Sequence, residues 1–134
     1  MSKNKFLIEP DVLPKLFAYP SEYIEFVSLN SKYNGAMVNL PPWSFASEEL
    51  WALNESKEKF GDVLVPFAQA EMQDLMAYFK VGSEVVLCNP WENIIIENFR
   101  GFKEWLAFAS KYSETFLVEN AHFKERKYWY PSNA

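Results

Sequence analysis

Cysteine, histidine and glycine are scarce in this sequence of 134 residues, which has one Cys, one His and four Gly. The single cysteine, Cys88, excludes a disulfide within the chain. With His122 as the only histidine and no second cysteine, none of the usual zinc-ligand spacings occurs. The glycines form no phosphate-binding loop. We therefore predict a protein without a metal site, a cofactor or catalytic residues.

Long apolar runs are also absent. No segment approaches the roughly 20 apolar residues of a membrane-spanning helix. Residues 1–10 lack the apolar run of a signal peptide. We therefore expect a cytoplasmic protein that does not contact a membrane.

Aromatic residues, in contrast, are abundant. Hydrophobic residues make up 49% of the chain and aromatic residues 18%. A chain of this length and composition buries a sizeable core without a disulfide or a metal. We predict one domain over residues 1–134, with aromatic rings both in its core and on its surface.

The formal net charge is -5 and is unevenly distributed. From Ala121 onward there are three basic residues and one acidic residue, so the first 120 residues carry 10 basic and 17 acidic residues. An acidic body argues against direct binding to nucleic acid and leaves a basic protein partner possible. We expect the basic tail from about residue 120, with Tyr128, Trp129 and Tyr130, to be weakly ordered unless its rings dock.

The first half of the chain contains two helix signals. Pro20 precedes a helix predicted over about Ser21–Ser31. Ala36–Leu40 is predicted to be an edge strand or an extended connection. A second, brief helix starts near Ser47, and Asn54–Lys59 is predicted to be a solvated turn.

The second half of the chain contains several β-branched and apolar runs. Val63–Val65 is predicted to be a short strand that Pro66 stops. Val81-Gly82 is predicted to be a two-residue hairpin turn, and Ile94–Ile96 is the clearest strand signal. Two further predictions are a long helix opening at Asn98 or Gly101 and a final strand or turn at Phe116–Val118.

Between these runs, residues 72–79 support two incompatible interpretations. Met72, Leu75, Met76 and Phe79 have the spacing of one buried helical face. The same residues also suit a strand that feeds the hairpin at Val81-Gly82.

Carboxylates are the remaining candidates for chemistry. Five acidic residues fall in or beside the predicted strands and could gather as a carboxylate pair or a cation site: Asp62, Asp74, Glu84, Glu92 and Glu97. A solvated face is the preferred interpretation, because acidic side chains are seldom buried. Cys88 is interpreted as an inert small hydrophobe and His122 as a solvated side chain.

Several short motifs, in order, resemble those of the SUKH superfamily, which includes a fungal regulator of cell-wall synthesis and many bacterial immunity proteins. Residues 20–27 are similar to its P-x-x-Y-x-x-F-[LV] helix, and Tyr33-Asn34-Gly35 follows. Residues 64–68 are similar to its [LI]-x-P-F-A strand, and Asp74 lies where the next strand carries Asp. Residues 102–106 are similar to its terminal F-x-x-[FW]-L helix.

This resemblance implies an α+β fold with a twisted, largely antiparallel sheet and helices packed against one face. It also implies a strand at Asp74–Lys80 rather than a helix, paired with Glu84–Cys88. Its functional implication is a non-catalytic protein that binds and neutralises a bacterial toxin, often a nuclease. The alternative is a regulatory or scaffold protein that binds an endogenous cellular protein, and a hydrolase that uses Asp62 or Asp74 ranks third.

For a basic toxin surface, acidic and aromatic residues in turns or exposed element ends are the natural contacts. We predict partner-binding residues among Glu48, Glu49, Trp51, Glu55, Trp91 and Glu92. The sequence leaves the oligomeric state open.

Overall fold

The computed structural model describes residues 7–31, 40, 42–45, 50–70 and 74–119. Within them, helices and strands follow one another as α1 (Ser21–Ser31), β1 (Ser44–Phe45), α2 (Leu50–Phe60), β2 (Val65–Ala70), β3 (Leu75–Phe79), β4 (Val85–Asn89), β5 (Ile94–Phe99) and α3 (Phe102–Glu119).

The strands form one sheet in the order β1-β2-β3-β4-β5, and every neighbouring pair is antiparallel. Because each of the last four strands pairs with its neighbour in sequence, β2 to β5 form a meander, in which short turns suffice as connections. The predicted α+β class with an antiparallel sheet is confirmed.

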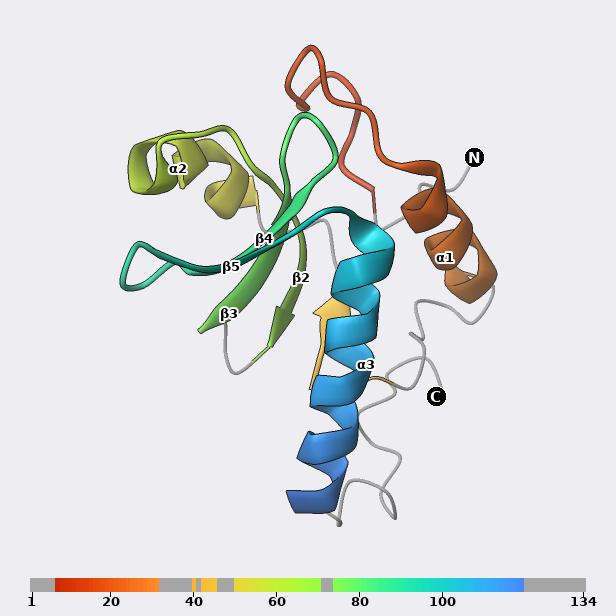
Figure 1. Cartoon of the computed structure of the whole chain (residues 1–134). Helices are drawn as coiled ribbons and strands as arrows, with labels where there is room; N and C mark the ends of the chain where they lie inside the picture. The colour runs from red at the N-terminus through yellow and green to blue at the C-terminus, as the bar shows by residue number, and fades with distance from the viewer. Residues whose placement is uncertain (1–6, 32–39, 41, 46–49, 71–73, 120–134) are drawn as a thin grey trace.

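The sheet is covered on both faces (Figure 1). Successive side chains of a strand point to opposite faces. In β3, Ala77 and Phe79 belong to the larger cluster with α1 and α3, whereas Met76 and Tyr78 belong to a smaller cluster with α2. Two helices therefore share one face, as the resemblance implied, and α2 adds a layer on the other.

The larger core is built from aromatic rings. Phe67 of β2 stacks on Phe79 with ring centroids 4.2 Å apart. The indole of Trp105 meets the Phe67 ring edge-on, with centroids 4.9 Å apart. Tyr23 of α1 approaches Phe67 at 5.4 Å. All four residues are fully buried. Such ring pairs contribute roughly 0.5–1.5 kcal/mol each beyond their buried area.

The first helix has the predicted bounds, Ser21–Ser31. The carbonyl oxygen of Pro20 accepts hydrogen bonds from the backbone N–H groups of Tyr23 and Ile24, at 3.0 and 3.1 Å. Proline suits this position because its missing N–H would have no helical partner there.

The second helix is longer than predicted. α2 continues to Phe60, so the prediction of a solvated turn at Asn54–Lys59 was wrong. The segment consists of good helix formers, and Glu55 and Lys59 stand four residues apart on one turn and pair. Within residues 54–59 the fully buried side chain is that of Ser56, and this polar residue interrupts the apolar spacing by which a helix is recognised in a sequence.

The strand β2 passes through Pro66, so the prediction that this residue stops the strand was wrong. Pro66 pairs with Tyr78 of β3 and stands at a register shift. On the other side, β1 pairs only with Ala68 and Gln69, so no ladder bond with β1 is required of Pro66. Proline is tolerated in strands at such positions.

Residues 75–79 form a strand, so the choice between helix and strand is settled for the described part of this segment. Its connection to β4 is a three-residue loop, Val81 to Ser83, rather than the predicted two-residue turn. The N–H of Ser83 donates to the Lys80 carbonyl at 2.8 Å, and Ser83, not Val81 or Gly82, has a positive φ of 77°. This is the usual form of a three-residue hairpin loop.

The third helix begins at Phe102, directly after Gly101, and continues to Glu119. The predicted final strand or turn at Phe116–Val118 was therefore wrong, since no Gly or Pro interrupts the helix before that point. Glu104 accepts hydrogen bonds from the backbone N–H of Arg100 at 2.8 Å and from its guanidinium at 3.2 Å. The backbone bond, followed by the guanidinium bond and charge, lowers the pKa of Glu104.

Three predictions lie at least partly outside the described residues. They are the strand or extended connection at 36–40, of which only Leu40 is described, the helix start near Ser47, and the weakly ordered tail from about 120 with His122.

Candidate protein-binding surface

Three of the six predicted partner-binding residues lie in one region. Glu55 is on the exposed side of α2, and Trp91 and Glu92 form the turn between β4 and β5. Trp51 lies in the first turn of α2, with its side chain outside the described part, and Glu48 and Glu49 also fall outside the described residues. We call Glu55, Lys59 and residues 90–97 the hairpin surface.

A buried serine fixes α2 against the sheet. The hydroxyl of Ser56 donates to the Leu53 carbonyl and accepts from the backbone N–H of Leu64, both at 2.9 Å. Phe60, at the end of the helix, packs edge-on against Tyr78 of β3 with centroids 5.8 Å apart. Gly61 then ends the helix with a φ of 77°, and its N–H donates to the Lys57 carbonyl at 2.8 Å. The exposed side of α2 is therefore held in a fixed position.

The β4–β5 turn is shaped by two asparagines. The side-chain oxygen of Asn89 accepts hydrogen bonds from the backbone N–H groups of Trp91 and Glu92, at 2.9 and 3.1 Å. Such a bond to the backbone two residues on defines the turn. Asn93 returns the chain to β5 with a φ of 57°, a left-handed conformation that asparagine tolerates better than most residues. Trp91 and Glu92 are consequently presented at the tip.

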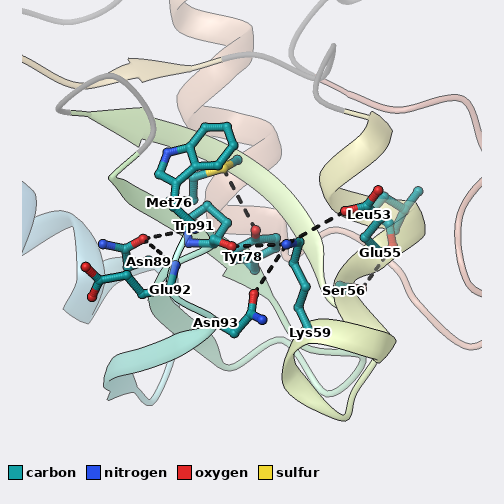
Figure 2. A network of polar contacts seen from close by, with 11 residues as sticks. Leu53, Glu55, Ser56, Lys59, Met76, Tyr78, Asn89, Trp91, Glu92 and Asn93 are labelled. Carbon is teal, nitrogen blue, oxygen red and sulfur yellow. Dashed lines mark hydrogen bonds and ion pairs between the residues drawn. The ribbon is translucent and has the colours of Figure 1, made fainter.

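Lys59 connects this turn to α2 (Figure 2). Its ammonium group donates to the Pro90 carbonyl at 3.1 Å and to the Asn93 side-chain oxygen at 3.3 Å. The same group lies 3.8 Å from the carboxylate of Glu55. The Lys59 side chain is only 22% exposed and joins α2 to the turn, and the Glu55 carboxylate balances its charge.

The exposed charge of the hairpin is negative. Residues 85–99 contain Glu92 and Glu97 but no lysine or arginine. Both glutamates are exposed. Lys59, which reaches the turn from α2, is paired with Glu55, and Arg100, the residue after β5, is paired with Glu104. The hairpin therefore offers two carboxylates to a partner.

Large apolar side chains accompany these carboxylates. Trp91 is 58% exposed, and Ile94, Ile95 and Ile96 are 46%, 44% and 48% exposed. Within the described residues, these four are half of the eight large hydrophobic side chains that are exposed, and they fall within six consecutive positions. A concentration of this kind marks an interaction site more often than scattered exposed residues do.

The region offers no described group suited to covalent or metal chemistry. Burial raises the pKa of the Cys88 thiol to about 12, so the thiol stays protonated near neutral pH. Among the described residues, no three His, Cys, Asp or Glu side chains come together in a way that would hold a metal ion. What the hairpin surface can do is contact another molecule through apolar, aromatic and acidic side chains.

The sequence did not assign five residues of this surface to partner binding: Lys59, Ile94, Ile95, Ile96 and Glu97. The run Ile94–Ile96 predicted a strand correctly, but β-branched residues favour strands at the edge and in the centre of a sheet alike, so the exposure was not foreseen. Glu97 was considered only as a possible acid or cation ligand. Lys59 was placed in a solvated turn, and the four-residue spacing from Glu55 was the signal that would have placed it on a helix.

Comparisons with family models, with curated proteins and with solved structures find no match to this chain. Of the described helices, none has both the length and the apolar character required to cross a bilayer.

Proposed function

We propose that this chain is a non-catalytic protein-binding domain, and that its partner is a bacterial toxin which it neutralises by occlusion. The observation that carries the proposal is the hairpin surface, where exposed Trp91 and three isoleucines adjoin Glu92 and Glu97 in a stretch, residues 85–99, without lysine or arginine. Aromatic anchors within a polar rim are typical of protein–protein contacts.

The toxin as partner rests on the resemblance to the SUKH superfamily. The order of elements supports it: a helix after Pro20, a strand at residues 65–70, an adjoining strand that begins just after Asp74, and a closing helix from Phe102. These are the positions of the motifs on which the resemblance was based.

Neutralisation requires no chemistry from this protein. A nuclease toxin has a basic substrate groove, and acidic side chains that cover it exclude the nucleic acid. Glu92 and Glu97 would face the basic groups, while Trp91 supplies a buried anchor in the complex. Complementary charge also accelerates association, and it does so less as the salt concentration rises.

Co-expression with a toxin encoded beside this chain's gene tests the proposal. We expect growth to be rescued and a complex of the two proteins to be recovered by size-exclusion chromatography. Absence of both rescue and complex refutes the toxin-binding function. A stable complex with an endogenous protein in cells that lack the toxin gene assigns the regulatory role instead.

A pair of charge reversals locates the contact. Glu92→Lys at the hairpin tip should slow association and weaken the complex, whereas Glu114→Lys on α3, also exposed, should leave both unchanged. Trp91→Ala should cost about 2 kcal/mol or more of binding free energy if the indole is an anchor. Thermal unfolding of each variant alone shows whether folding is preserved.

A further inference from the structure

The strand β5 ends the sheet on one side. Its inner edge pairs with β4, from Val85↔Phe99 to Asn89↔Ile94. Along its outer edge there is no strand in the described part of the chain, and the sheet order stops at β5. The edge is six residues long, whereas the opposite edge strand, β1, has two. The N–H and C=O groups of an edge strand are a template for a further strand.

The side chains of β5 fit this role. Ile94, Ile95 and Ile96 are each close to half exposed, and the register with β4 shifts at Ile96. Ile95 pairs with Cys88 and Ile94 with Asn89, so isoleucine side chains flank the edge on both faces of the sheet. An added strand would therefore gain backbone hydrogen bonds and apolar contacts together.

Most of the usual protections of an edge strand are missing here. β5 contains no lysine, proline or glycine, and it is not a short strand; its one irregularity is a register shift at Ile96, which lies between the residues paired with Leu87 and Cys88. The hairpin projects away from α1 and α3, on the side of the molecule where α2 lies (Figure 1). No described helix covers its outer edge.

The charges near β5 favour one kind of added strand over another. Glu97 lies within the strand and Glu92 just before it, with no basic residue between 85 and 99. A second copy of the chain would bring two more carboxylates to the same seam, and like charges across neighbouring strands destabilise pairing. A segment with lysine or arginine beside its apolar residues would pair with Glu92 and Glu97 instead.

We propose that β5 binds an extended segment of a different protein, apolar in its centre and basic at its flanks, which joins the sheet as a sixth strand. This inference rests on the proposed protein-binding function and specifies its surface and its mode. The hairpin tip, with Trp91, would contact the partner beyond the added segment.

The probe is a synthetic peptide of alternating valine and threonine with two lysines at each end, mixed with the full chain. Amide hydrogen exchange of residues 94–98 reports strand addition directly, because an outer-edge N–H becomes protected only when it is bonded. Two matched peptides, one with glutamates in place of the lysines and one with a central proline, serve as comparisons. We expect protection of β5 with the basic peptide and none with the other two.

Two variants of the protein sharpen the test. Ile95→Lys places on the edge the residue that natural edge strands use against pairing, and it should weaken peptide binding at least about tenfold. Val118→Lys makes the same change at an exposed position of α3 and should leave binding unchanged. Glu97→Lys should weaken binding of the basic peptide and strengthen binding of the acidic one.

Three outcomes overturn the proposal. One is no protection of β5 at peptide concentrations of about 1 mM, where even a weak complex of about -4 kcal/mol is half formed. A second is equal protection by the basic and acidic peptides. The third is concentration-dependent dimerisation with protected β5 in the absence of peptide, which would make a second copy the occupant.

Failure of this inference is distinguishable from failure of the proposed function. A toxin complex that forms and survives Ile95→Lys keeps the function and refutes the strand addition. Protection of β5 by the basic peptide, without any toxin rescue, keeps the strand-addition site and refutes the toxin.

Discussion

Two buried serines provide a matched test of how α2 and α3 are held. Ser56 and Ser113 are the only buried polar side chains among the described residues, and each lies on the core-facing side of a helix. The hydroxyl of Ser56 bonds to the Leu53 carbonyl and to the Leu64 N–H. The hydroxyl of Ser113 has no hydrogen-bond partner in the described part. The same substitution, serine to alanine, should therefore have opposite effects.

Ser56→Ala should destabilise the fold mainly because the backbone N–H of Leu64 loses its hydrogen-bond acceptor. This residue is only 1% exposed, so its N–H would lose its partner without gaining water. An unpaired buried donor costs about 1–3 kcal/mol. Alanine returns about 0.5 kcal/mol through its helix propensity. We expect a net loss of about 0.5–2.5 kcal/mol in the free energy of unfolding.

Ser113→Ala removes a buried hydroxyl that makes no hydrogen bond in the described part. The helix propensity gain of about 0.5 kcal/mol applies equally here. We expect a protein that is as stable as the original or up to about 1 kcal/mol more stable, because an unpaired polar group is replaced by an apolar one.

Urea unfolding followed by circular dichroism measures both variants on one scale. The dependence on urea should be unchanged, so that the midpoints alone report stability. The two variants should differ by about 2 kcal/mol, or roughly 4–16 °C in melting temperature for a domain of this size. The reasoning is refuted if Ser56→Ala lies within about 0.5 kcal/mol of the original, or if Ser113→Ala is the more damaging change.

Three further predictions follow from the described geometry. Because the Arg100 N–H lowers the pKa of Glu104, this carboxylate stabilises the fold fully above the ordinary value of about 4.3 and less as the pH falls through its folded value. Glu104→Gln should therefore lower the melting temperature more at pH 7 than at pH 3, and an equal effect at both pH values would contradict the assigned bond. Cys88, buried with a pKa of about 12, should not react with a thiol reagent at pH 8 until denaturant is added, and rapid reaction of the native protein would contradict its burial. Gly61→Ala should lower the free energy of unfolding by about 1 kcal/mol, because residue 61 has a φ of 77°, although no atom lies near the added methyl group. Gly61→Asn should lower it less, and equal melting temperatures for the alanine variant and the original protein would contradict the assigned conformation.

The sequence predicted elements where one signal dominated. The helix Ser21–Ser31 follows from Pro20 and its apolar face, and the strand at Ile94–Ile96 follows from three β-branched residues in a row. For residues 75–79, periodicity alone favoured a helix. Pairing with β2 and β4 buries these side chains on both faces, which no local pattern encodes.

The wrong predictions share one physical origin. Each concerns a residue whose structure depends on the elements that pack beside it and not on its neighbours in the sequence. Ser56 looks polar in the sequence, yet its two hydrogen bonds make it a buried helix position. Pro66 is typical of a residue that ends a strand, yet it pairs with Tyr78 of β3, and β1 pairs with Ala68 and Gln69 and so requires no hydrogen bond from Pro66. For the candidate surface, Trp91, Glu92 and Glu55 were chosen as exposed ends, whereas the exposure of Ile94–Ile96 depends on β5 being the last strand.

The unequal edges of the sheet also limit how this protein can polymerise. A chain of molecules joined edge to edge needs two usable edges on every copy, and in the part of the chain that the structure describes the second edge strand, β1, has two residues. If two copies joined through β5, each would have only β1 left to offer as an edge among the described strands. Such assembly terminates at a pair, because an interface that uses the same strand of both copies closes on itself. The sequence IIIENF of β5 is therefore less hazardous in this fold than the same segment would be in an unfolded chain.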